Sequence, residues 1–104
     1  MKEKFYATIK GKNFNGEEIS REAQVFFTPY ASADISSCGL TKTTIVNILK
    51  SAGQYLLTKK EGEKFRFITS YLPVHVFVSG RIIYRDELEM EILVTRVSLD
   101  AQII

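Results

Sequence analysis

The sequence is poor in the residues that build catalytic and metal sites. Among its 104 residues there is one cysteine, Cys38, and one histidine, His75, and there is no tryptophan. One cysteine cannot form a disulfide within the chain, and one cysteine with one histidine cannot complete a typical four-ligand zinc site. We therefore expect no metal, no cofactor and a reducing, cytoplasmic compartment.

Long apolar runs and a strong charge of one sign are also missing. Runs such as Ile92–Val94 are far too short to span a bilayer, and no apolar stretch follows Met1–Tyr6, so neither a membrane span nor a secretory signal is expected. The formal net charge is only +2, from 14 basic and 12 acidic residues. That balance permits contact with nucleic acid but does not demand it.

What is present is an ordinary globular composition. Hydrophobic residues make up 45% of the chain and charged residues 25%, which excludes global disorder. The length favours one domain, residues 1–104, and is sufficient to bury a core without disulfides.

The first 28 residues predict a β-hairpin. Residues 4–11 alternate, with Phe5, Ala7 and Ile9 on one face, as in a half-buried strand. Asn15-Gly16 is a strong tight-turn signal, and a second strand is predicted over about 19–28. Pro29 ends that strand because it lacks an amide donor. The small and polar residues 30–39 predict a loop or one short helical turn.

An amphipathic helix is predicted over 41–60. Its apolar residues recur at helical spacing: Ile45, Ile48, Leu49, Ala52 and Leu56. Thr41 is the expected N-cap, and Gly62 is a good stop signal. Gly53 interrupts the pattern at a cost of about 1 kcal/mol relative to alanine, or else allows a close approach to the sheet.

Three strands are predicted after the helix, with Pro73 between the first two. For the last hairpin, a three-residue connection, Arg85-Asp86-Glu87, places Tyr84 opposite Leu88 and Ile82 opposite Met90. It also pairs Arg81 with Glu91, which have opposite charges. Bends are predicted at Gly80 and between Val94 and Val97, where the apolar phase slips by one residue, as in a β-bulge.

The predicted element order is therefore β-β-α-β-β-β. The fold class that follows is α+β: a small, strongly bent antiparallel sheet or partial barrel of about five strands, with one amphipathic helix.

No pattern in the chain predicts an enzyme. Cys38 and His75 are the only candidates for a Cys–His pair, but Cys38 lies in no usable motif and His75 lies within a strand. The segment Gly39–Thr44 precedes a helix as a phosphate-binding loop does, but it lacks the glycine required before Lys42. We expect no catalytic residues.

Residues 34–49 carry one family resemblance. Cys38, Gly39, Leu40 and Thr41 follow the order of a small residue, a glycine, an apolar residue and a cap. With the apolar positions after them, these residues resemble the turn and recognition helix of helix-turn-helix DNA-binding proteins. The resemblance implies six groove-facing residues: Lys42, Thr43, Thr44, Val46, Asn47 and Lys50. The alternative is a capped helix that packs on a sheet through Ile45, Ile48 and Leu49.

The sheet offers a second route to nucleic acid. Small, bent, five-stranded folds with one helix include barrels that bind single strands through a basic groove and stacking aromatic residues. The residues that supply this mixture are Tyr6, Phe26, Arg66, Tyr71, Phe77, Arg81 and Arg85.

The functional prediction is a non-enzymatic binding domain whose partner is DNA, single- or double-stranded, bound through a basic helix face or the bent sheet. The predicted contact residues are Lys42, Thr43, Asn47, Lys50, Arg66, Arg81 and Arg85. The alternative is a protein-interaction, inhibitor or accessory-subunit module. Such a module would bind a protein partner or form a homo-oligomer through a sheet edge, an aromatic patch or the apolar residues 101–104.

Overall fold

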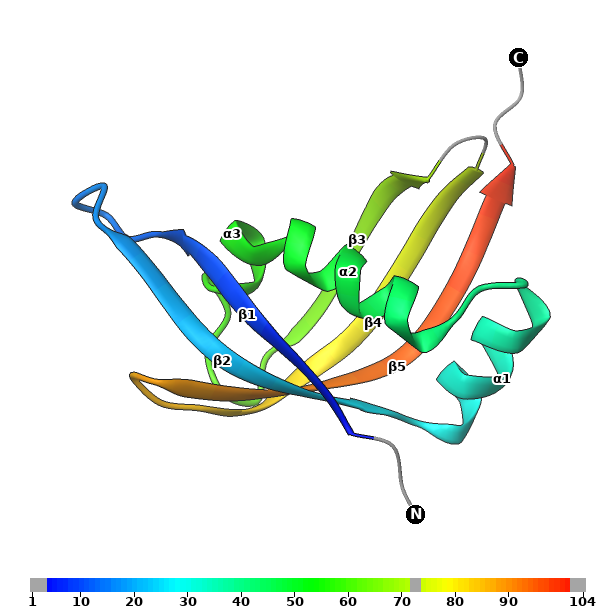
Figure 1. Ribbon diagram of the computed structural model, residues 1–104, viewed down its shortest axis with the longest axis horizontal. Coiled ribbons are helices and arrows are strands. Elements are labelled where there is room, and N and C mark those ends of the chain that lie inside the picture. Colours follow the sequence, from blue (N-terminus) through cyan, green and yellow to red (C-terminus); the bar gives the residue numbers. More distant parts are fainter. Residues whose placement is uncertain (1–3, 72–73, 102–104) are drawn as a thin grey trace.

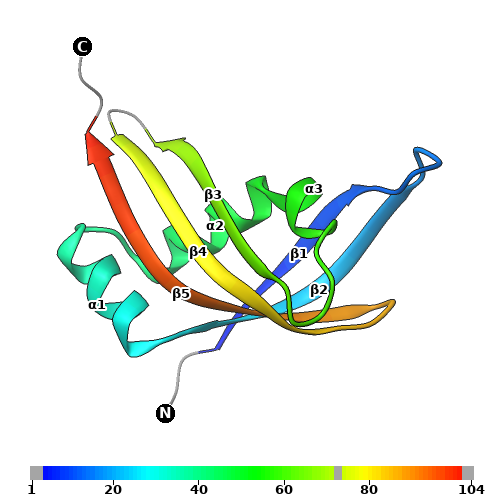
Figure 2. The ribbon, with the colours of Figure 1, turned by 180° about the vertical axis from the view of Figure 1, so that it is seen from behind.

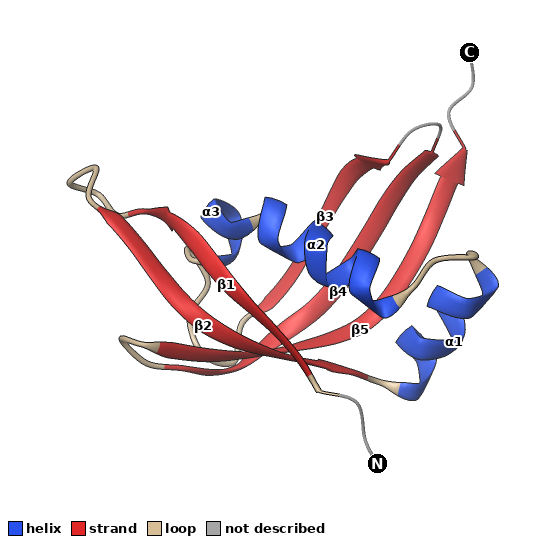
Figure 3. Cartoon of the chain, in the orientation of Figure 1, coloured by secondary structure: helices blue, strands red, loops and turns tan. Residues whose placement is uncertain are grey.

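One curved sheet organises the molecule. The structure is a computed structural model that describes residues 4–71 and 74–101. The elements in chain order are β1 (Phe5–Lys12), β2 (Glu18–Phe27), α1 (Pro29–Ser37), α2 (Lys42–Ser51), α3 (Gly53–Leu56), β3 (Lys64–Tyr71), β4 (Val74–Arg85) and β5 (Glu89–Ala101). The strands form one sheet in the order β1-β2-β5-β4-β3. It bends into a half-barrel, with α2 and α3 across its concave side and α1 beside β5 (Figure 1; Figure 3).

The predicted bent sheet of five strands is confirmed, but the sheet is mixed rather than wholly antiparallel. β1 and β2 form the predicted hairpin, and β3, β4 and β5 form an antiparallel meander. The two units join through a parallel pair, in which Glu22–Phe27 runs beside Glu89–Val94. Parallel neighbours such as β2 and β5 need a long crossover connection, and the helices that follow β2 form the first part of it.

The helical segment differs from its prediction in two ways. The single helix expected over 41–60 is two helices, α2 and α3, which meet at Ala52. An added Cβ on Gly53 would lie 2.4 Å from the carbonyl oxygen of Lys10, so the expected close approach to the sheet is confirmed. Residues expected to form a loop or a single turn form α1, because Thr28 caps the amide of Ala31 and Pro29 occupies the first helical turn.

The core lies between the concave face and the helices. The predicted apolar face of the helix is buried, and Thr41 accepts a hydrogen bond from the Thr44 amide at 3.1 Å as its cap. The largest fully buried side chains come from both layers: Ile9, Ile45, Leu49, Leu56, Ile82, Met90, Ile92, Val76, Val78 and Val94. Burying each side chain of this size contributes about 1.5–3 kcal/mol before entropy is counted.

The predicted register of the last hairpin is wrong. Arg85 lies opposite Met90, Tyr84 opposite Glu91, and Arg81 opposite Leu93. The Asp86 carboxylate fixes the turn, since its Oδ1 accepts the amides of Leu88 at 2.8 Å and Glu89 at 2.7 Å. This side-chain turn sets the register.

The bends predicted at Gly80 and between Val94 and Val97 are confirmed, and both fall in one bulge. Ser79 lies opposite Arg96 and Gly80 opposite Val94, which leaves Thr95 as the extra residue. A second shift, which was not predicted, lies between Ile82 and Tyr84, where Ile83 is the extra residue.

The edges of the half-barrel are held by α3. The Gln54 side chain accepts from the Lys12 amide at 2.7 Å and donates to the Lys12 carbonyl at 2.9 Å, on the outer edge of β1. The Tyr55 hydroxyl bonds both the amide and the carbonyl of Arg66 on β3, at 3.1 and 3.0 Å. Two consecutive side chains thus bridge the gap between the first and last strands of the sheet.

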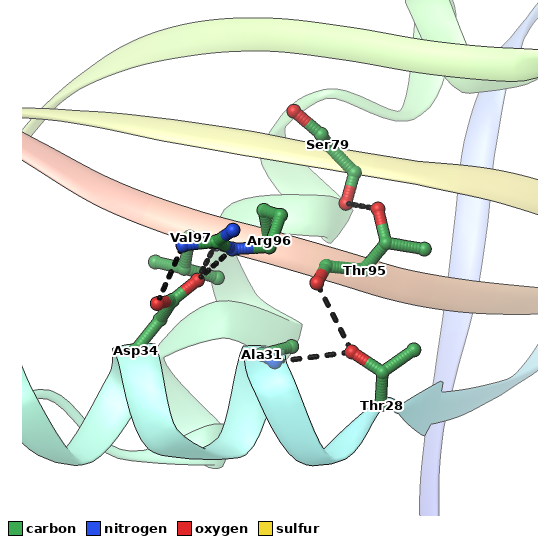
Figure 4. A network of polar contacts seen from close by, with 7 residues as sticks. All are labelled: Thr28, Ala31, Asp34, Ser79, Thr95, Arg96 and Val97. Carbon is green, nitrogen blue, oxygen red and sulfur yellow. Dashed lines mark hydrogen bonds and ion pairs between the residues drawn. The ribbon is translucent and has the colours of Figure 1, made fainter.

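The free edge of β5 is held by α1 (Figure 4). The hydroxyl of Thr28 donates to the carbonyl of Thr95 at 3.0 Å. The Asp34 carboxylate accepts from the Val97 amide at 2.9 Å and from Nε of Arg96 at 2.8 Å. The Arg96 hydrogen bond, followed by that of the Val97 amide, lowers the pKa of Asp34.

Asp34→Asn should lower stability at neutral pH but not in acid. A carboxyl whose pKa is lower in the folded state stabilises the protein above its unfolded pKa of about 3.9, and that stabilisation is lost as the pH falls through the folded pKa. We expect the free energy of unfolding to fall by about 1 kcal/mol at neutral pH. This is less than a buried hydrogen bond to a charged group usually contributes, because the pair is exposed to solvent. Urea unfolding at neutral and strongly acidic pH measures it, with Glu89→Gln as the control. An equal loss at both pH values would contradict the linkage.

Candidate nucleic-acid interface on the convex face of the sheet

The convex face of β3, β4 and β5 carries no helix (Figure 2). Four exposed cations stand on it, and we call them the convex cationic cluster: Lys64 and Arg66 from β3, Arg81 from β4 and Arg96 from β5. They share this face because they alternate along their strands with buried residues such as Phe65, Ile82 and Val97.

The register brings these cations together across neighbouring strands. Lys64 lies directly opposite Arg81, and Ser79 lies between Arg66 on one side and Arg96 on the other. Within the described part of the chain, only Arg96 of this cluster has a carboxylate within 4.0 Å, that of Asp34, and its side chain is still 66% exposed. Like charges directly opposite each other destabilise a sheet, so this arrangement costs folding energy.

An aromatic ring lies among the cations. A shallow hollow of about 310 Å³ is lined by Arg66, Phe77, Ser79, Arg96 and Ser98. Phe77 is half-buried, and Ile68, which lies opposite it on β3, is 51% exposed. The hollow therefore combines one aromatic side chain with two arginines and two serines.

The apolar surface continues towards the N-terminal hairpin. Phe26 lies beside Leu93, and Leu93 lies opposite Arg81, so these three residues form a row across β2, β5 and β4. Tyr6 on β1 is exposed on the same face, opposite Gln24. The side chain of Tyr71 lies outside the described residues.

Arg85 does not join Arg66 and Arg81, although the sequence grouped all three. The bulge at Ile83 reverses the alternation of β4, so Arg85 faces the concave side opposite the buried Met90. Its guanidinium donates to the carbonyl oxygens of Leu57, at 2.6 Å, and Lys59. The prediction from the sequence also did not include Lys64 and Arg96. A clue to Arg96 was the phase slip between Val94 and Val97 that surrounds it.

The predicted helix site is only partly exposed. α1 and α2 do form two helices joined by a turn at 38–41, and Thr43, Asn47 and Lys50 form one exposed stripe along α2. Lys42 instead packs over the ring of Phe27, 5.5 Å from its centroid. Val46, which the helix-turn-helix resemblance places towards the groove, is 7% exposed, so that implication is wrong.

The other functional classes gain no support from the residues that the structure describes. They contain no cluster of three or more histidine, cysteine or acidic residues placed to hold a metal ion. Cys38 is a free thiol in the turn after α1, whereas His75 lies in β4. No helix among them has both the length and the apolar character needed to cross a membrane.

Comparisons with protein-family models, with curated proteins and with solved structures each find no match to this chain. The function is therefore inferred from the chemistry of the convex face.

Proposed function

We propose that this protein binds single-stranded nucleic acid across the convex face of its sheet. The observation that carries the proposal is the convex cationic cluster, in which Lys64 and Arg81 lie directly opposite each other and Arg66 and Arg96 line a hollow with the half-buried Phe77. Local arrangements that oppose stability are typical of functional sites. A polyanion would relieve the repulsion, with phosphates on the cations and a base against Phe77.

The chemistry favours a single strand over a duplex. Aromatic side chains on a sheet stack on bases only when the base faces are exposed, as in single strands. The stripe on α2 offers Lys50 as its one exposed cation among the described residues, since Lys42 packs on Phe27. We infer a cytoplasmic protein, because the free thiol of Cys38 suits a reducing compartment.

A protein partner or a second copy of the chain is the weaker candidate. Strand addition needs free backbone groups at a sheet edge. At each edge, a side chain of α3 occupies the backbone groups of one residue in the strand: Gln54 those of Lys12 in β1, and Tyr55 those of Arg66 in β3. A sizing column run at several protein concentrations measures any self-association directly.

Binding to a short mixed-sequence DNA strand should fall steeply with salt. Each phosphate contact on a single strand contributes about −0.7 to the slope of log affinity against log salt, so four cations give about −2.8. The double variant Arg66→Gln/Arg81→Gln should reduce that slope by about 1.4. Fluorescence anisotropy over a salt series measures both, with the matching duplex as competitor.

Lys50→Gln/Lys60→Gln is the matched control, because it removes two exposed cations that lie away from the convex face, on α2 and in the loop after α3. It should leave the slope nearly unchanged. The proposal fails if no binding is seen at the lowest salt, if the duplex binds more tightly, or if the control pair lowers affinity more than the arginine pair.

A further inference from the structure

A second hollow opens at the other end of the half-barrel, on the concave side. It encloses about 870 Å³ between the β1–β2 turn, α3 and the β4–β5 turn. Small-molecule sites commonly have volumes of about 300–1,000 Å³, so a ligand of modest size would fit. Its apolar lining comes from Phe14, Ile19 and Leu57, and two arginines, Arg21 and Arg85, stand in its wall.

Neither of these arginines has a carboxylate partner among the residues that the structure describes. Nε and Nη1 of Arg21 donate to the backbone carbonyls of Asp86 and Ser20, both at 2.9 Å. Nη1 of Arg85 donates to two further carbonyls, those of Leu57 and Lys59. Within the described ranges no carboxylate oxygen lies within 4.0 Å of either guanidinium. Each guanidinium therefore has N–H donors left for a ligand.

The two guanidinium groups also act on each other. Burial, followed by the charge of Arg21, lowers the pKa of Arg85. Two like charges held together in a partly desolvated wall are unfavourable without a counterion. An anionic group placed between them would remove that cost.

The acidic residues around the hollow compensate this charge only in part. The hydrogen bond from Tyr84 and, to a smaller extent, the charge of Arg21 lower the pKa of Asp86. Asp86 uses Oδ1 for the amides of Leu88 and Glu89, and Oδ2 accepts from the Tyr84 hydroxyl at 2.6 Å. Glu61 accepts from the backbone amide of Arg85 at 3.2 Å. Glu87 also lines the hollow, but Lys12 and Lys60 line it as well. Among the described residues, four cations and three carboxylates thus line the hollow around an apolar surface.

We propose that this hollow binds a small organic anion. Its carboxylate or phosphoryl group lies between Arg21 and Arg85, and its apolar body packs on Ile19 and Leu57. Guanidinium groups suit both head groups because their N–H donors match the spacing of the oxygens. The site is separate from the convex face and does not depend on nucleic-acid binding.

NMR titration of the full chain tests the proposal through the Nε–H signals of Arg21 and Arg85 and the methyl signals of Ile19 and Leu57. The probes are decanoate and octyl phosphate, with decanol as the neutral analogue, and acetate and inorganic phosphate as bare head groups. Decanoate or octyl phosphate should shift all four sets of signals and bind at least about tenfold more tightly than decanol or the bare head groups.

Arg21→Gln should weaken this binding about tenfold or more. Arg85 is not substituted first, because it also holds the carbonyls that follow α3. Lys60→Gln, on an exposed side chain, is the second variant and should weaken binding less. Arg66→Gln on the convex face is the matched control and should change nothing.

Three results would overturn the proposal: equal binding of decanol and decanoate, full binding by Arg21→Gln, or signal shifts on the convex face alone. Displacement of decanoate by a short DNA strand that shifts Arg21 and Arg85 would assign the hollow to nucleic acid instead. Failure here leaves the convex-face proposal intact, since that proposal is measured by DNA binding to the Arg66 and Arg81 variants.

Discussion

Gly80→Ala is expected to lower the free energy of unfolding by at least about 3 kcal/mol, at the upper end of what overpacking causes. A Cβ at this position would lie 2.1 Å from the carbonyl oxygen of Leu93 and 2.5 Å from Cζ of Phe65. The Phe65 ring could move, but the Leu93 carbonyl belongs to the β4–β5 ladder and cannot move without breaking it. The substitution therefore opposes the bend that creates the convex face.

Thermal unfolding followed by circular dichroism measures this effect, and the midpoint should fall by at least about 12 °C. Gly16→Ala is the control, because Gly16 has φ of 77° and nothing within 4 Å of the added Cβ. Gly16→Ala should lower the free energy of unfolding by only about 1–2 kcal/mol, which is the cost of a left-handed backbone for alanine. If Gly80→Ala lowered the unfolding midpoint no more than Gly16→Ala does, β4 and β5 would not approach each other as closely as described.

Phe77→Ala is expected to weaken single-stranded DNA binding about 5- to 150-fold, which corresponds to about 1–3 kcal/mol of base stacking. The salt slope should stay unchanged, because removing a neutral ring removes no phosphate contact. The opposite pattern is expected for Arg66→Gln/Arg81→Gln. The two variants thus separate stacking from charge in one anisotropy series.

Two further variants are controls for this experiment. Phe77→Tyr keeps the aromatic face and should retain most of the affinity. Leu88→Ala removes an exposed apolar side chain at the β4–β5 turn and should have no effect. Circular dichroism spectra verify that Phe77→Ala remains folded, since the ring is half-buried. Unchanged affinity in a folded Phe77→Ala protein would remove the stacking part of the proposal.

Local patterns in the sequence were sufficient for much of the fold. Alternating residues and Asn15-Gly16 identified the first hairpin, and helical spacing with the Thr41 cap identified α2. Gly80 and the phase slip after Val94 located the first bulge. Each of these features depends on neighbours within a few residues, so a single sequence contains the information.

The features that were missed depend on contacts between distant residues or on one side chain. The parallel pairing of β2 with β5 leaves no local trace, because both strands alternate as antiparallel strands do. α1 was missed because Thr28 and Pro29 end a strand and start a helix at the same place. The last hairpin followed the hydrogen bonds of Asp86 instead of the charge pair expected between Arg81 and Glu91.

For the same reason, the sequence predicted only part of the candidate site. Arg66 and Arg81 were selected as strand cations, and the register places them on one face. Arg85 was counted on that face by simple alternation, but the bulge at Ile83 moved it to the hollow. Lys64 and Arg96 became relevant only once the three strands were aligned, since neither stands in a recognisable motif.

The parallel junction between β2 and β5 has a consequence for how the chain folds during synthesis. The hairpin of β1 and β2 contains only local contacts and can form early, but its buried face needs Ile92 and Val94 from β5. β5 is the last described strand to leave the ribosome. Until then, the backbone groups on the β5 side of β2 stay unpaired. Closing so long a loop is slow, and we expect a high contact order to make this junction the rate-limiting step of folding.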